Sequence, residues 1–183
     1  MRKTCELPSY SASTIGSTPT VRASSNRLSP AGTSLFYGSA DPETAVAEIS
    51  AHDSRPYAAV AAFELIRPAT VIDLIDFSEK IRKRSDADSW PMGFIREFAE
   101  DISRPVDRDG REHLEYVPTQ VLTEYFRYLS PLDVDGIRFH SAQNHGINYV
   151  LFVGPEGCAD SVNEAPRALL RLLSHTVRVF ERS

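Results

Sequence analysis

Short apolar runs typical of β-strands and longer patterns typical of helices follow one another along this chain in no regular order. A strict alternation of strand and helix would predict a doubly wound parallel sheet, and its absence favours an α+β fold. The expected strands are 34–37, 57–66, 70–75, 136–139, 148–153 and 176–180, and the expected helices are 41–51, 118–128 and 168–173.

The clearest helix start lies at residues 41–43. Asp41 is a residue type that caps free backbone amides, Pro42 suits the first helical position, and Glu43 is favourable in the first turn. We expect this helix to end near residue 51, with Glu48 at the edge of its apolar stripe. Residues 78–103 mix charges and aromatic side chains, which predicts one or two further helices over the sheet.

The composition predicts one domain. The chain has 183 residues, of which 42% are hydrophobic and 25% charged, as in ordinary soluble globular proteins. Residues 9–34 are dominated by Ser, Thr, Pro and small side chains, which cannot by themselves offset the entropy cost of ordering. We therefore expect a leader or linker at 1–21 and a folded domain at 22–183.

The net charge of −5 argues against a partner as polyanionic as nucleic acid. The basic run at 80–84 is followed by Asp86 and Asp88, which indicates a solvated helix end or loop. Cys5 and Cys158 lie far apart, and the five histidines have no metal-binding spacing, so we predict no metal site.

No segment suggests insertion into a membrane. The first 14 residues lack the apolar stretch of a secretory signal, and no run approaches the roughly 18 apolar residues of a membrane span. The prediction is a protein without a membrane partner whose site of action is the cytoplasm. The glycine-rich signatures of dinucleotide and P-loop sites are also absent, so any nucleotide must be bound by other means.

Several linked motifs then occur in a specific order. Residues 26–48 read NRLSPAGTSLFYGSADPETAVAE, with an arginine loop, a Pro-x-Gly turn, a strand ending in tyrosine and a helix carrying glutamate. Residues 116–126 (YVPTQVLTEYF), 135–141 (DGIRFHS) and 148–152 (NYVLF) follow. Together these segments resemble the RES domain family, whose motifs often have an aromatic residue and asparagine where this chain has Leu28 and Ser29.

The family takes its name from an arginine, a glutamate and a serine, which match Arg27, Glu48 and Ser141. The resemblance implies an ADP-ribosyltransferase-like fold, with a mixed β-sheet core and flanking helices around a NAD⁺ cleft. It also implies a toxin that degrades NAD⁺ as its substrate and has no prosthetic group. A neutralising antitoxin or immunity protein is implied as the partner that binds this toxin.

The chemistry of each side chain agrees with these roles. Two parallel hydrogen bonds from a guanidinium recognise phosphate oxygens, so Arg27 is expected to bind the pyrophosphate, with Arg22 assisting. Cleaving the nicotinamide–ribose bond develops positive charge on the sugar, as in glycoside hydrolysis. A carboxylate beside the ribose stabilises this charge, and Glu48 is our candidate.

The remaining candidates are expected to bind the dinucleotide. Tyr37 can stack on the nicotinamide ring, or it can be a core tyrosine. Ser141 follows a strand and is assigned to binding, because no base stands in a recognisable triad with it. Tyr116 and Gln120 are weaker candidates for the cleft, for which core packing is equally expected.

The acceptor of the ADP-ribose group stays open at this level: water, phosphate and a protein side chain all require the same bond cleavage. ADP-ribosyl transfer to a protein is therefore an alternative. A catalytically silent module that binds ADP-ribose or a partner protein is another, although simple binding does not require a carboxylate beside a forming cation.

Overall fold

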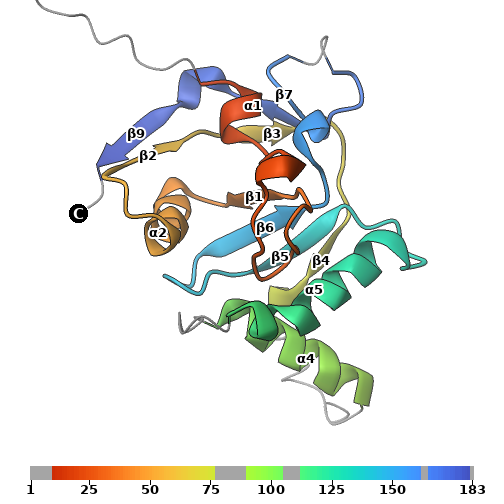
Figure 1. The fold of residues 1–183 in the computed structure, drawn as a ribbon. Helices are drawn as coiled ribbons and strands as arrows, with labels where there is room; N and C mark the ends of the chain where they lie inside the picture. Colours follow the sequence, from red (N-terminus) through yellow and green to blue (C-terminus); the bar gives the residue numbers. More distant parts are fainter. Residues whose placement is uncertain (1–9, 77–89, 105–111, 162–164, 182–183) are drawn as a thin grey trace, which may run out of the picture.

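The computed structural model describes residues 10–76, 90–104, 112–161 and 165–181. Its strands form a four-stranded sheet and two smaller sheets, with α2 between the smaller sheet β2–β9 and the larger sheet, and with α4 and α5 at the opposite end of the molecule (Figure 1). The expected mixture of helices and strands is confirmed.

The four-stranded sheet has the order β1-β6-β5-β4. Its strands are β1 (Phe36–Ser39), β6 (Ile147–Leu151), β5 (Gly136–His140) and β4 (Val71–Asp73). β6 is antiparallel to both neighbours, whereas β4 is parallel to β5. The hairpin of β5 and β6 was expected from the sequence, with its turn at 141–146.

Two strands that follow each other closely in the chain, β2 and β3, belong to different smaller sheets. β2 (Tyr57–Val60) pairs with β9 (Arg178–Glu181), and β3 (Phe63–Leu65) pairs with β8 (Leu170–Leu172), to which β7 (Cys158–Ala159) adds in parallel. The single strand expected at 57–66 is therefore wrong, because the chain changes sheet between Val60 and Phe63. The helix expected at 168–173 is also wrong: Leu170 and Leu172 are buried on the two sides of Arg171, with the period of a strand.

The helices are α1 (Ala12–Ile15), α2 (Pro42–His52), α4 (Trp90–Ser103) and α5 (Glu112–Tyr128), with 3₁₀ turns at Thr20–Arg22, Pro155–Gly157 and Ser174–Thr176. α2 begins as expected. α5 starts six residues before Pro118, which lies inside the helix and is exposed, so the expected start was wrong. Burial of Thr119 and Thr123 and packing of Phe126 on the core stabilise α5 on the C-terminal side of Pro118, which lacks a backbone amide.

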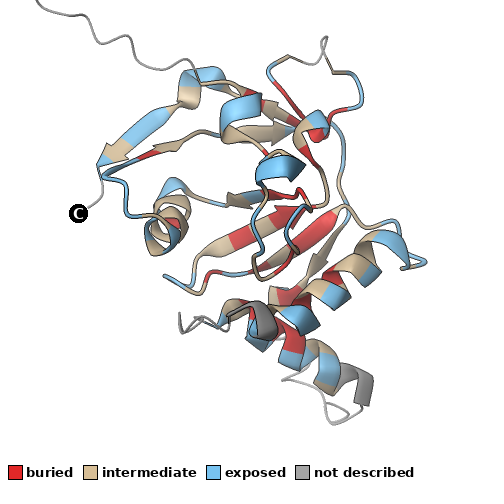
Figure 2. Cartoon of the chain, viewed as in Figure 1, coloured by how far each residue is buried: buried red, intermediate tan, exposed pale blue. Residues whose placement is uncertain are grey.

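Two apolar cores lie on the two faces of the four-stranded sheet. Figure 2 shows in red the buried residues along β5 and β6 of this sheet. The first joins the sheet to α4 and α5, with Ile137 and Val150 fully buried beside Phe98. The second joins the other face to the sheet β3–β8–β7 through Phe36, Leu151, Leu169, Leu170 and Leu172. Side chains along each strand alternate between the two cores. This alternation places Tyr37 and Asn148 on the side of the first core.

The leader packs on the domain where the structure describes it. Ala12 of α1 is buried in the second core, and the Ser17 hydroxyl donates to the carbonyl of Val153 at 2.9 Å. The expected leader or linker at 1–21 and the domain boundary at residue 22 stay predictions. The basic run at 80–84 lies outside the described residues.

Candidate active site

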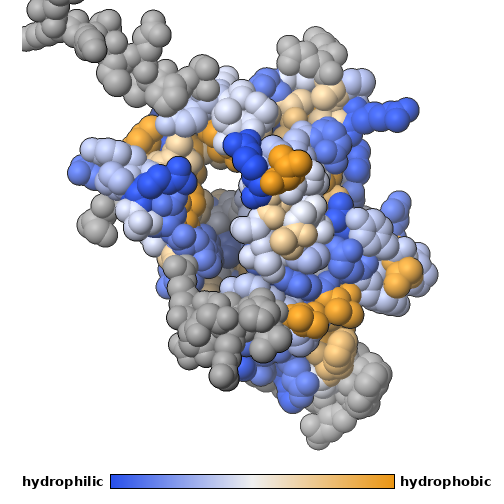
Figure 3. Space-filling view, viewed as in Figure 1, coloured by the Kyte–Doolittle hydropathy of each residue, from blue (hydrophilic) through white to orange (hydrophobic). Residues whose placement is uncertain are grey.

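A cleft of about 1080 Å³ lies between α2 and the loop that precedes β1. Figure 3 shows the molecule hollowed between these two parts. The cleft is lined by Ser24, Ser25, Asn26, Arg27, Leu28, Tyr37, Gly38, Ser39, Ala45, Glu48, Ile49, Ala51, His52, Asp53, Ile102, Tyr116, Phe139, Ala142, Gln143, Asn148 and Tyr149. Most of the polar lining comes from α2, the loop and the central sheet.

α2 is fixed at its N-terminus before it reaches the cleft. The Asp41 carboxylate accepts from the backbone amide and the hydroxyl of Thr44 at 2.7 and 2.9 Å. Both hydrogen bonds lower the pKa of Asp41, and the bond from the backbone amide has the larger effect. Thr44 is itself buried and accepts from the Asn144 amide at 3.1 Å, which ties the helix to the β5–β6 turn.

The Glu48 carboxylate is positioned by two donors from that same hairpin. Ser141 Oγ donates to Glu48 Oε1 at 2.6 Å, and Asn148 Nδ2 donates to the same oxygen at 2.7 Å. The Asn148 side-chain oxygen accepts from Ser39 Oγ at 2.7 Å, which fixes the orientation of its amide. Both bonds end on Oε1, and no hydrogen bond from a described residue reaches Oε2, so Oε2 is the oxygen left for a ligand in the cleft.

Ser141 lies behind the glutamate. Its side chain is fully buried, donates to Glu48 and accepts from the Gln143 amide at 3.0 Å. Ser141 is not among the described residues that line the cleft. The structure thus places it where it orients Glu48, and a direct contact with a dinucleotide would need its hydroxyl to be uncovered.

The loop that carries Arg27 is closed by the side chain of Asn26. Its Oδ1 accepts from the backbone amides of Leu28 and Ser29, both at 3.1 Å, and from the Tyr37 hydroxyl. From α5, Gln120 Nε2 donates to the Asn26 carbonyl at 2.6 Å. The backbone on both sides of Arg27 is therefore fixed, and the Leu28 side chain is buried in the first core.

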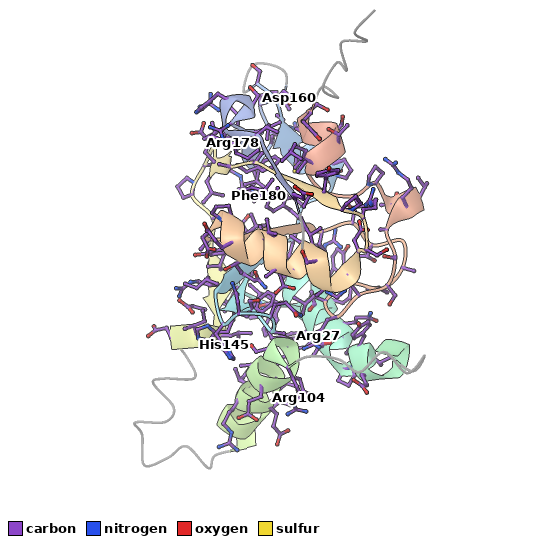
Figure 4. The ribbon with its side chains drawn as sticks, turned by 90° about the vertical axis from the view of Figure 1, so that its left-hand side faces the viewer. Arg27, Arg104, His145, Asp160, Arg178 and Phe180 are labelled. Atoms are coloured by element: carbon purple, nitrogen blue, oxygen red, sulfur yellow. The ribbon has the colours of Figure 1, made fainter. Side chains whose placement is uncertain are left out.

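The Arg27 guanidinium donates to the backbone carbonyl of Asp101, and Figure 4 shows Arg27 beside the C-terminal end of α4. Burial lowers the pKa of Arg27, an effect that the nearby Tyr116, Asp101, Glu115 and Glu48 oppose. A cation that is partly desolvated and bound to a neutral carbonyl in a cleft is suited to an anionic ligand.

Tyr37 presents its ring and its hydroxyl to different surroundings. The residue is 45% exposed, whereas its hydroxyl bonds to Asn26 and lies 3.1 Å from Ser29 Oγ. Burial of the hydroxyl raises the pKa of Tyr37 well above its ordinary value. The phenol is thus a fixed, neutral group that leaves the ring face available in the cleft.

The comparison with protein-family models decides the family. The model of the RES domain matches residues 4–172 of this chain. The chain belongs to the RES domain family. No curated protein and no solved structure matches it.

Four of the residues expected in the RES site line one cleft: Arg27, Tyr37, Glu48 and Tyr116. Gln120 instead bonds to the arginine loop. Arg22 is exposed in the 3₁₀ turn Thr20–Arg22, outside the described lining of the cleft, so the structure does not bring it to Arg27.

Sequence reasoning missed Asn148, Ser39 and Asn26. A signal for Asn148 existed: it alternates with Val150 on the buried face of β6, where a polar side chain needs a hydrogen-bond partner. Nothing local marks Ser39, because its role depends on the pairing of β1 with β6 at Asn148.

Two absences are found in the described part of the chain. No group of three or more His, Cys, Asp or Glu side chains is placed to bind a metal ion there, and the predicted lack of a metal site stays a prediction. No described helix combines the length and the apolar character that crossing a bilayer requires.

Proposed function

We propose that this RES domain cleaves the bond between nicotinamide and ribose in NAD⁺ and acts as a toxin by depleting the dinucleotide. The observation that supports it is the shared cleft: Glu48, with Oε1 fixed by two donors, lines the same cavity as Arg27 and Tyr37. If these side chains lay on opposite faces of the molecule, one dinucleotide could not contact them together, and the proposal would be excluded.

Glu48 supplies the negative charge that the reaction needs. When the bond from ribose C1′ to the nicotinamide nitrogen breaks, its electron pair stays on that nitrogen, and nicotinamide leaves as a neutral molecule. The ribose carries the positive charge in the transition state. A carboxylate that two hydrogen bonds already orient stabilises this charge without reorganising during the reaction.

Arg27 is the proposed ligand of the pyrophosphate. On binding, its guanidinium exchanges the neutral carbonyl of Asp101 for charged phosphate oxygens. Charge-assisted hydrogen bonds of this kind are about twice as strong as neutral ones. The cleft volume of about 1080 Å³ lies at the upper end of ordinary ligand sites, as an extended dinucleotide requires.

Tyr37 is proposed to stack on the nicotinamide ring. Its exposed ring lies on β1, in the same lining as Glu48, and its hydroxyl is occupied by Asn26 and Ser29. Stacking on an aromatic face contributes on the order of 1 kcal/mol beyond the area buried. This arrangement sets the leaving group next to the carboxylate.

The finer points of the proposal follow the family resemblance. Water adding to C1′ yields ADP-ribose after loss of a proton, phosphate yields a phosphorylated ADP-ribose, and a protein nucleophile yields an ADP-ribosylated protein. We propose water or phosphate as acceptor, an ADP-ribosyltransferase-like arrangement of the core, and action on the cytoplasmic NAD⁺ pool. A neutralising antitoxin or immunity protein is the proposed partner, with neither nucleic acid nor membrane involved.

Mass spectrometry of the products tests the proposal. The purified protein is incubated with NAD⁺, with and without phosphate, and nicotinamide release is the expected result in at least one condition. Glu48→Gln should nearly abolish turnover, while Glu43→Gln, exposed in the first turn of the same helix, should leave it unchanged. Arg27→Ala should chiefly raise KM.

Unchanged NAD⁺ in both conditions would support the silent binding module instead. Wild-type turnover by Glu48→Gln would remove the catalytic assignment while leaving the substrate in place. Label that appears on added protein and not in small products would favour the ADP-ribosyltransferase alternative.

A further inference from the structure

The outer face of α5 is mostly apolar from Val117 to Tyr128, and Glu124 is the charged residue on it. Val117, Val121, Tyr125 and Tyr128 follow one another at spacings of four, four and three residues, which places them on one side of a helix. Their exposed fractions are 49%, 65%, 43% and 63%, and Leu129 and Leu132 continue the surface with 73% and 66%. We call these six side chains the α5 face. Figure 3 shows orange side chains over this helix.

The packing needs of α5 inside the subunit are met by its other side. Leu122 and Phe126 pack on the first core, Thr119 and Thr123 are buried, and Gln120 bonds to the arginine loop. The α5 face lies mostly outside these contacts, and it touches them where the Tyr125 ring packs edge-on against Phe126, with ring centroids 5.7 Å apart. Exposed apolar patches of this extent mark interaction sites on soluble proteins.

The size of the α5 face suits a dimer. With full side-chain areas of about 150–250 Å² for the large residues, the six side chains expose on the order of 700 Å². Two such faces together approach the roughly 1,600 Å² of a standard stable interface. The face is also larger than the largest apolar patch on many monomers, which is about 300–600 Å².

The order of side chains on the face favours a second copy as the occupant. The small residues Val117 and Val121 come first, and the large residues Tyr125 and Leu129 follow. We propose that α5 packs antiparallel on α5 of a second copy of this chain. A two-fold axis between Val121 and Tyr125 then sets each valine opposite a large side chain, as a self-complementary interface requires.

The charges around α5 fit this occupant better than a membrane. Helices that lie on membranes have Lys and Arg along their polar side. The sequence of α5 has three glutamates and one arginine, Arg127. That arginine lies 3.9 Å from Glu124 and stacks over the Tyr128 ring at 4.8 Å. Beside the α5 face, Glu124 and Arg127 carry opposite charges, so the face can meet its own copy without excess charge of one sign.

Sedimentation velocity over a concentration series tests the proposal, which does not depend on the reaction at the cleft. The wild-type protein should form a dimer. Val121→Glu should raise the dissociation constant on the order of 100-fold, because two carboxylates would be buried without partners. Val21→Glu is the matched control: Val21 is 91% exposed in the Thr20–Arg22 turn, outside the α5 face, and its dimer should persist.

Circular dichroism and the thermal midpoint report whether each variant is folded. Both variants should be folded, because the substituted positions are exposed. A wild-type monomer at high micromolar concentration would overturn the proposal, and so would a folded Val121→Glu that remains dimeric. Binding of a monomer to anionic vesicles would assign the α5 face to a lipid surface instead.

Disulfide crosslinking tests the antiparallel arrangement. In a Cys5→Ser background, where the remaining Cys158 is buried, Val121→Cys is mixed with Tyr125→Cys under mild oxidation. The mixture should crosslink faster than either variant alone, because the two positions lie opposite each other across the axis. Faster crosslinking of either single variant would contradict this geometry.

Discussion

The amide of Asn148 donates to Oε1 of Glu48 at 2.7 Å, across 100 positions of sequence. Glu48 comes from α2 and Asn148 from β6, and the second donor, Ser141, comes from the turn that connects β5 to β6. The carboxylate is therefore oriented by the sheet and not by its own helix.

Asn148→Ala is expected to lower kcat by about 10- to 100-fold, since a hydrogen bond to a charged group contributes roughly 1.5–3 kcal/mol. NAD⁺ turnover measures the effect. Asn144→Ala is the matched control. Asn144 lies in the same hairpin as Asn148, but its side chain donates to Thr44 and does not bond to Glu48. Equal losses in both variants would show that the hairpin as a whole, and not the amide at 148, supports the reaction.

Ser141→Ala is expected to keep measurable turnover at a kcat reduced by about 10- to 100-fold, with little change in KM. The physical reason is that the buried hydroxyl orients Glu48 and does not reach the cleft. Single-turnover kinetics check it. A complete loss of activity in a folded variant, or a covalent adduct at Ser141 in the wild type, would instead make the serine a nucleophile.

Tyr37→Phe is expected to be about 1 kcal/mol less stable than the wild type at pH 8, because the hydrogen bonds of the hydroxyl to Asn26 and Ser29 are lost. Burial raises the pKa of Tyr37 in the folded protein, whereas the unfolded chain loses this proton near pH 10. The contribution is thus fully present below about pH 10 and is lost as the pH rises further.

Urea unfolding of both proteins from pH 8 to pH 11.5 measures this difference. The gap between wild type and Tyr37→Phe should narrow above pH 10, and tyrosines other than Tyr37 cancel in the comparison. A constant gap would mean that the Tyr37 hydroxyl titrates alike in the folded and unfolded states.

Gly146→Ala is expected to destabilise the protein by about 1–3 kcal/mol, as overpacked sites do. A Cβ at this position would lie 2.0 Å from Thr44 Oγ1, between the β5–β6 turn and the start of α2. Because the same turn supplies Ser141, turnover should fall together with stability. Gly93→Ala is the control: its Cβ meets nothing within 4 Å in α4, and it should stabilise the helix by about 0.5–1 kcal/mol.

Local patterns predicted the elements that local chemistry controls. The capping residues at Asp41–Glu43 located α2, and the polar turn at 141–146 located the β5–β6 hairpin. They failed where a partner strand decides the outcome. Leu170 lies in a strand because β3 and β7 flank it, and residues 57–66 divide between two sheets because β9 and β8 lie side by side with them.

The site shows the same division. Arg27, Tyr37 and Glu48 were expected together from the family resemblance, and the structure places them in one cleft. The assignment of Ser141 to ligand contact could not anticipate that its hydroxyl would be covered, since burial depends on α2 docking over the turn. The alternation along β6 marks Asn148 as a buried polar residue, but its pairing with Ser39 depends on strand register, which a single sequence does not reveal.

The ring of bonds around Asn26 has a thermodynamic consequence for the arginine loop. One oxygen receives the Leu28 amide, the Ser29 amide and the Tyr37 hydroxyl, and α5 fixes the same loop through Gln120. The conformational entropy of this segment is thus lost when the chain folds and not when a ligand arrives. Association with an anion should accordingly be fast and should leave the backbone of residues 25–29 unchanged.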